Sequence, residues 1–151
     1  DVILVGEIRD RDTGQMALSA AETGHLVLAT MHTRDAKGAV SRYADLFPQN
    51  VQTEIRAQLS TSLRAVISQH LLSSTTPGGK RELALEILIN NSPIASAIRS
   101  GKIESIDNCI LTGRADGMLT LDESIKRLLA AGKISWHTAE QYVSDPGVLR
   151  R

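Results

Sequence analysis

Residues 1–10, DVILVGEIRD, decide the fold. Four apolar residues, Val2–Val5, come shortly before a carboxylate at Glu7. A second run of mostly apolar residues, Leu26–Met31, ends directly before His32. Short apolar runs that are separated by a helical stretch and followed by polar residues are typical of neighbouring, buried parallel strands. The pattern therefore predicts an α/β fold with a mainly parallel sheet.

Polar side chains follow both predicted strands. Ligands of open α/β sheets bind beyond the carboxyl ends of the strands, so we expect Glu7, Arg9 and His32 at a ligand-binding edge. A strand-end carboxylate is typical of the acid that holds Mg²⁺-bound water or polarises the attacking water in phosphate-loop ATPases. The alternative is a carboxylate that merely pairs with Arg9 or Arg11.

The other half of such a nucleotide site is missing from these 151 residues. A phosphate loop of the form G-x-x-x-x-G-K-[ST] does not occur. The nearest glycine clusters, Thr76–Lys80 and Ser100–Lys102, have the wrong spacing. Gly78 and Gly79 lie between two strand-like runs and therefore predict a hairpin turn.

Composition excludes several classes of protein. The 17 acidic and 17 basic side chains balance, and no basic run of five residues occurs, so nothing indicates nucleic-acid binding. No apolar stretch approaches the ~18 residues of a membrane span, and no signal sequence is recognisable. Cys109 is the single cysteine, which excludes an internal disulfide and a cysteine-rich zinc module. These features suit a cytoplasmic location. The start inside an apparent strand suggests a part of a longer protein.

Residues 1–90 alternate between strand and helix patterns. Asp12 is the expected cap of the first helix, which Gly24 ends, and Asp35 the expected cap of the second, which Pro48 ends. A third helix is predicted by Val51, Ile55, Leu59 and Leu63, which recur every four residues. Two strands should follow, Leu63–Leu72 and Glu82–Ile89, as a hairpin. We therefore expect one domain of parallel sheet plus hairpin over residues 1–90.

Residues 91–151 have only helical patterns and predict a helical C-terminal subdomain. The expected helix starts are Ser92 with Pro93, Ser105, Thr120 with Glu123 as a capping box, and Ser135.

Two histidines flank the second predicted strand. His25 and His32 are seven residues apart, so they lie on opposite faces if the chain between them is extended. They are therefore a poor pair of metal ligands. A lone histidine is more often a hydrogen-bonded surface or core residue than a catalytic one.

Two motifs and the tail resemble a known family. Residues 1–10 resemble the Walker B segment of secretion-type traffic ATPases, and residues 21–33, AETGHLVLATMHT, are similar to their His box. Residues 62–69 and 98–102 continue the match, and residues 112–122 resemble the type IV pilus retraction branch. One departure is Ala95, where that branch has arginine.

The resemblance implies the C-terminal half of a RecA-like ATPase core from a homo-hexameric motor that powers pilus retraction and twitching motility. ATP and Mg²⁺ would be its cofactors. Glu7 would be the Walker B acid and would hold Mg²⁺ through water, while His25 and His32 would face the nucleotide and the neighbouring subunit. Arg9 and Thr33 would support the nucleotide.

The resemblance further implies contacts with an inner-membrane pilus platform protein and the pilin machinery, at the cytoplasmic face of that membrane. Without a phosphate loop, residues 1–151 alone should be inactive. Three alternatives stay open. They are a motor of a related type II/IV secretion or pilus assembly system, a non-enzymatic interaction module, and a phosphate-binding α/β enzyme of unrelated chemistry.

Overall fold

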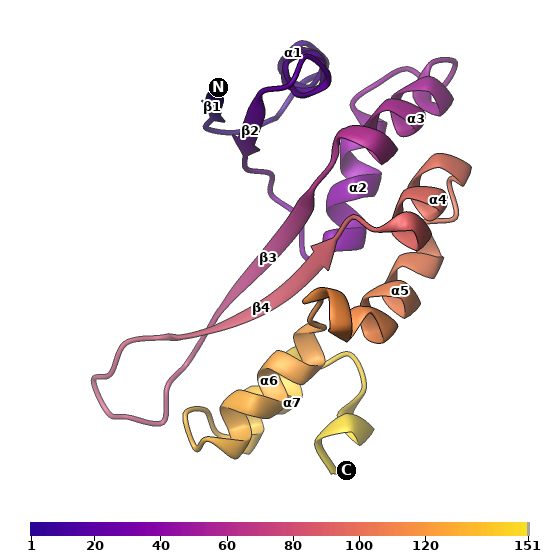
Figure 1. Ribbon diagram of the computed structural model, residues 1–151. Helices are drawn as coiled ribbons and strands as arrows, with labels where there is room; N and C mark the ends of the chain where they lie inside the picture. Colours follow the sequence, from indigo (N-terminus) through magenta and orange to yellow (C-terminus); the bar gives the residue numbers. More distant parts are fainter. Residues whose placement is uncertain (151) are drawn as a thin grey trace.

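The computed structural model describes residues 1–150, with two two-stranded sheets and helices packed beside them (Figure 1). The N-terminal elements are β1 (Val2–Val5), α1 (Arg11–Glu22), β2 (Leu26–Ala29), α2 (Ala36–Asp45) and α3 (Gln52–Ser62). The hairpin strands β3 (Ala65–Leu72) and β4 (Glu82–Ile89) follow. The remaining helices are α4 (Ser92–Ser100), α5 (Ile106–Thr112), α6 (Leu121–Ala130) and α7 (Trp136–Tyr142), with 3₁₀ turns η1 (Ile103–Ser105), η2 (Gly113–Asp116) and η3 (Pro146–Arg150).

Strands β1 and β2 pair in parallel, as predicted, with α1 as the crossover between them. The register runs from Val2 opposite Leu26 to Val5 opposite Ala29. Within residues 1–150 this sheet is separate from the β3–β4 sheet. The expectation of buried strands is wrong for this chain, because Leu4 is 77% exposed and no element of residues 1–150 covers that face.

The hairpin is confirmed. Strands β3 and β4 are antiparallel, with Ala65 opposite Ile89 and Leu72 opposite Glu82. Strand β3 begins later than the predicted Leu63, because the Leu63 N–H still bonds the last turn of α3. The connection turns at Gly78, whose φ of 67° lies in the left-handed region that favours glycine.

Some helix caps differ from the expected ones. Asp10, rather than Asp12, caps α1, because Asp10 has extended backbone and its carboxylate accepts the Thr13 N–H at 2.9 Å. Asn91, rather than Ser92, caps α4 in the same way. Three predicted caps are confirmed by side-chain hydrogen bonds, namely Asp35, Thr120 and Ser135.

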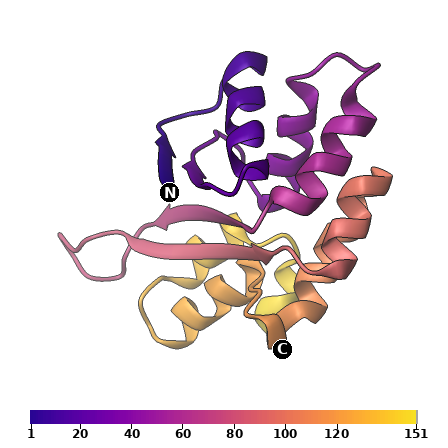
Figure 2. The same cartoon turned by 45° about the horizontal axis from the view of Figure 1, so that its top comes forward.

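The apolar core crosses the predicted boundary at residue 90. Its main cluster joins Val40 and Ile55 of the N-terminal helices to Leu88, Ile98 and Ile110. A second cluster packs α6 and α7 against one face of the hairpin, which therefore lies between them and the N-terminal elements (Figure 2). The division into two domains stays a prediction, and its last residue, Arg151, lies outside the described residues. Among those, no helix is both long and apolar enough to cross a bilayer.

Candidate functional site

The chain beyond β1 is held against the chain beyond β2. Past the last ladder pair, the Ile8 N–H donates to the Thr30 carbonyl at 3.0 Å. The Thr30 hydroxyl also bonds the Gly6 carbonyl. Since the strands are parallel, both segments leave the same edge of the sheet. Glu7 and His32 are therefore brought together there.

Glu7 is the centre of this cluster. Its Oε2 lies 2.5 Å from Nη2 of Arg9, and its Oε1 lies 3.4 Å from Nε2 of His32. The Glu7 side chain is 21% exposed, whereas that of His32 is 85% exposed. A small cavity of about 240 Å³ opens here, lined by Glu7, Ile8, Arg9, Met31, His32 and Arg42.

The neighbouring Arg9 guanidinium keeps the Glu7 carboxylate charged. The hydrogen bond from Arg9 lowers the pKa of Glu7 below its ordinary value. Partial loss of hydration acts in the opposite direction, and the charges of Arg9 and His32 add to the lowering. The same ion pair raises the pKa of Arg9. Glu7 is thus an anionic acceptor at neutral pH, as required of a group that orients a water molecule or holds a metal-bound one.

The donor set suits Mg²⁺ only in part. Among residues 1–150, no three histidine, cysteine or acidic side chains lie close enough together to hold a metal ion. Mg²⁺ is often bound by one or two carboxylates together with water and substrate phosphates. The ionised Glu7 fits that single-carboxylate role through water, and the remaining ligands would have to come from elsewhere.

His25 lies away from this cluster. It precedes β2, so the whole strand separates it from His32, at about 3.3 Å per residue. Its Nδ1 lies 3.1 Å from the Ala20 carbonyl and 3.3 Å from the Thr23 hydroxyl, at the end of α1. His25 does not line the cavity beside Glu7, and its predicted role facing the nucleotide and the neighbouring subunit stays a prediction.

Thr33 also lies apart from the Glu7 cavity. Its hydroxyl donates to the Asp35 carbonyl at 3.4 Å, at the entrance to α2. Thr33 does not line the cavity beside Glu7, and its predicted support of the nucleotide stays a prediction.

Sequence reasoning missed Arg42 and Thr30. Arg42 lies on α2, two turns after its cap, and reaches the cavity from a different element than Glu7 and His32. Its position in the helix after the second strand could have indicated that Arg42 lies near the ligand-binding edge. No sequence pattern indicated the role of Thr30, because its hydroxyl donates to a carbonyl 24 residues away in the sequence.

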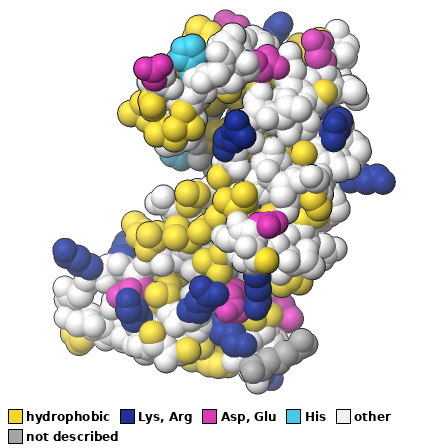
Figure 3. Space-filling model, viewed as in Figure 1, with side chains coloured by type: hydrophobic (Ala, Val, Ile, Leu, Met, Phe, Trp, Pro, Cys, Tyr) yellow, Lys and Arg dark blue, Asp and Glu magenta, His cyan; other side chains and the backbone are white. Residues whose placement is uncertain are grey.

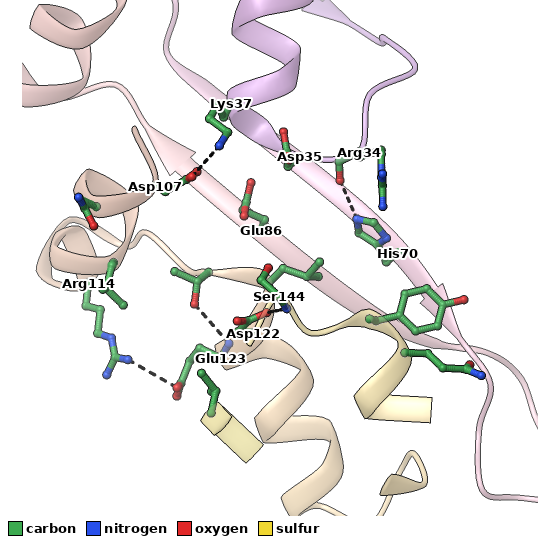
Figure 4. Close-up of a pocket in the computed structure, with 17 residues that line it drawn as sticks. Arg34, Asp35, Lys37, His70, Glu86, Asp107, Arg114, Asp122, Glu123 and Ser144 are labelled. Atoms are coloured by element: carbon green, nitrogen blue, oxygen red, sulfur yellow. Dashed lines mark hydrogen bonds and ion pairs between the residues drawn. The ribbon is translucent and has the colours of Figure 1, made fainter. Parts of the chain in front are cut away.

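A larger cavity of about 890 Å³ lies between the start of α2, the hairpin and the C-terminal helices (Figure 4). Among the described residues, four of its charged side chains form two ion pairs with one another. Lys37 lies 2.7 Å from Asp107, and Arg114 lies 3.5 Å from Glu123. Across the surface seen in Figure 3, apolar side chains gather over β1 and β2 and along the hairpin, where Val2, Leu4, Ile67 and Leu71 are exposed.

We expect Arg9→Gln to raise the pKa of Glu7 towards its ordinary value of 4.5, because the hydrogen bond that lowers it most is removed. Since pairing lowers the folded-state pKa, its contribution to stability is present above the unfolded-state pKa and is lost as the pH falls through the folded one. A titration of the Glu7 carboxyl carbon by NMR measures the shift. Arg11→Gln is the matched control, and an equal shift in both variants would contradict the assignment.

Comparison with known proteins identifies a family that this chain matches. The family described as Type II/IV secretion system protein matches residues 1–145. The chain is 47% identical over 141 residues to the "Twitching motility protein" of Neisseria gonorrhoeae, covering 93% of this chain and 37% of that protein. It is 44% identical over 146 residues to the "Type IV pilus retractation ATPase PilT" of Pseudomonas aeruginosa, covering 97% and 42%.

A solved structure is similar as well. The crystal structure of the pilus retraction motor PilT with bound ADP superposes with a TM-score of 0.86 and 40% identity, covering 100% of this chain and 42% of that one. The predicted α/β, RecA-like fold is thereby confirmed. This chain spans about two-fifths of the length of the relatives described here. It belongs to the Type II/IV secretion system protein family.

Proposed function

We propose that this chain is part of an ATP-hydrolysing motor that powers type IV pilus retraction and twitching motility. The observation that carries the proposal is the ionised Glu7 beside His32 at the carboxyl edge of two parallel strands. The similarity to proteins named as twitching-motility and retraction ATPases supports it.

In this proposal Glu7 accepts a hydrogen bond from the water that attacks the terminal phosphate, or from water bound to Mg²⁺. When bound, Mg²⁺ would neutralise charge on the phosphate oxygens. Arg9 keeps the Glu7 carboxylate charged and limits its movement, since the two groups lie 2.5 Å apart. The exposed imidazole of His32 is free to donate a hydrogen bond to a phosphate oxygen or to a group of a neighbouring subunit.

The remaining parts of the site have to come from outside residues 1–151. These residues contain no phosphate loop, and phosphoryl transfer depends on positioning and charge neutralisation by several groups together. We therefore expect the isolated chain to be inactive. The full motor would be a homo-hexamer at the cytoplasmic face of the inner membrane, in contact with a pilus platform protein and the pilin machinery.

A second candidate is the motor of a related secretion or pilus assembly system. It is favoured by 35% identity over 157 aligned positions to the "Type II secretion system protein E" of Klebsiella pneumoniae. Ala95, at a position where the retraction branch has arginine, points the same way. A retraction assay in a strain lacking the gene separates the two, because only the retraction motor restores twitching.

Glu7→Gln in the full-length protein should leave nucleotide binding nearly unchanged and lower kcat by about 10²-fold or more. The amide keeps the shape of the side chain but is neutral and a weaker acceptor. Fluorescent-nucleotide titration and phosphate release measure the two effects. Glu54→Gln, an exposed carboxylate on α3, is the control. A loss of binding as large as the loss of turnover would instead indicate a purely structural ion pair with Arg9.

His32→Ala should lower turnover at least about tenfold and shift the melting temperature by less than about 2 °C, since a side chain that is 85% exposed contributes little to packing. Steady-state kinetics of the assembled protein and thermal unfolding measure these effects. His137→Ala, on the exposed surface of α7, serves as the control. Unfolding of the His32 variant, or full activity, would refute this role.

A further inference from the structure

The segment that carries His32 is anchored at both ends. It connects β2 to α2, and at its beginning Thr30 bonds the chain beyond β1. Among the described residues, the one polar contact of the His32 side chain is the 3.4 Å contact with Glu7, and this side chain is 85% exposed. The side chain therefore cannot fix its own position by packing. Its place must come from the backbone on either side.

Two side chains of the hairpin hold the other end of this segment. His70 on β3 donates from Nε2 to the Arg34 carbonyl at 2.8 Å. Glu86 on β4 accepts the Ala36 N–H at 2.7 Å through Oε1. Figure 4 shows both side chains reaching from the hairpin towards Arg34 and Asp35. These contacts join positions 36 and 50 residues apart in the sequence.

Glu86 is not needed as an ordinary helix cap. Asp35 already caps α2, because its carboxylate accepts the Gly38 N–H at 2.6 Å. The half-buried position of Glu86, and the nearby Asp35 and Asp107, raise its pKa, so the fold disfavours the charged form of this carboxyl group. Within residues 1–150 no lysine, arginine or histidine pairs with it. The backbone N–H groups of Ala36 and Leu121 favour its charged form.

We propose that Glu86 and His70 are positioning residues, which hold residues 34–36 against the hairpin and thereby place His32 beside Glu7. This inference rests on the proposed function, since it assigns the two side chains to the same ATPase site. His32 lies two residues after the Thr30 anchor and two before the Arg34 anchor. With both anchors made, the short backbone between them has little room to move. With one anchor lost, the imidazole is held only by its weak contact with Glu7.

The test compares variants that remove each anchor with variants that keep it. Glu86→Leu loses the acceptor, whereas Glu86→Gln keeps a carbonyl oxygen that can accept the Ala36 N–H. His70→Phe keeps the ring that packs edge-on against Tyr142 but loses the donor, whereas His70→Gln keeps a donor. The matched controls are Glu82→Leu, on the same face of β4 beside Lys133, and His137→Phe on α7.

Two readouts are taken on the full-length protein. Hydrogen exchange of the amides of Ala36, Gly38 and Ala39, whose hydrogen bonds form the start of α2, reports whether the segment is held. Steady-state kinetics report whether holding it matters, through kcat and KM separately. We expect Glu86→Leu and His70→Phe each to speed exchange at least about tenfold and to lower kcat about tenfold with little change in KM. Glu86→Gln, His70→Gln and the controls should stay close to the wild-type protein.

Several results would overturn the inference. Unchanged exchange in Glu86→Leu and His70→Phe means that the anchors do not hold the segment. Faster exchange with unchanged kcat means that catalysis does not depend on holding the segment in place. Equal losses in the glutamine variants or in the controls mean general destabilisation. If the wild-type protein shows no turnover, the proposed function fails by itself, and the exchange data still decide whether the two side chains hold the segment.

Discussion

The parallel pairing of β1 with β2 is the constraint on which the candidate site depends. It makes the chain leave both strands at one edge, and the hydrogen bonds of Thr30 with Ile8 and Gly6 extend this registry past the ladder. Glu7 and His32 are 25 positions apart in the sequence, and they meet only because of it. A shift of the register by one residue would turn every side chain of β2 to the other face of the sheet.

The ion pair between Glu7 and Arg9 does not compete with a catalytic role. The sequence left two roles open for Glu7, an ion pair with an arginine or a functional carboxylate. The arrangement of its two oxygens is compatible with both roles at once. Arg9 occupies Oε2, while Oε1 faces His32 and the small cavity. The guanidinium lowers the pKa of the carboxyl, which keeps an acceptor available over a wider pH range. Arg42 adds a second guanidinium to the cavity lining beside that of Arg9, a charge pattern that suits a phosphate-bearing ligand.

Local patterns predicted much of this structure. Apolar runs placed β1 and β2, glycines placed the hairpin turn, and Asp35 was correctly expected at the start of α2. It was harder to predict which of two neighbouring residues caps a helix. Both Asp10 and Asp12 are suitable residue types for the start of α1, and only the backbone geometry selects Asp10. Contacts between distant segments could not be predicted. The bond between Glu86 and Ala36 spans 50 residues, and the exposure of β1 depends on what packs against the sheet.

The most direct test of the account is a structure of the full-length protein with a non-hydrolysable ATP analogue and Mg²⁺. We expect the Glu7 carboxylate to lie within hydrogen-bonding reach of the terminal phosphate or of a metal-bound water, directly or through one water, with His32 at the same phosphate or at the subunit boundary beside it. A nucleotide bound elsewhere, with Glu7 engaged only by Arg9, would contradict it.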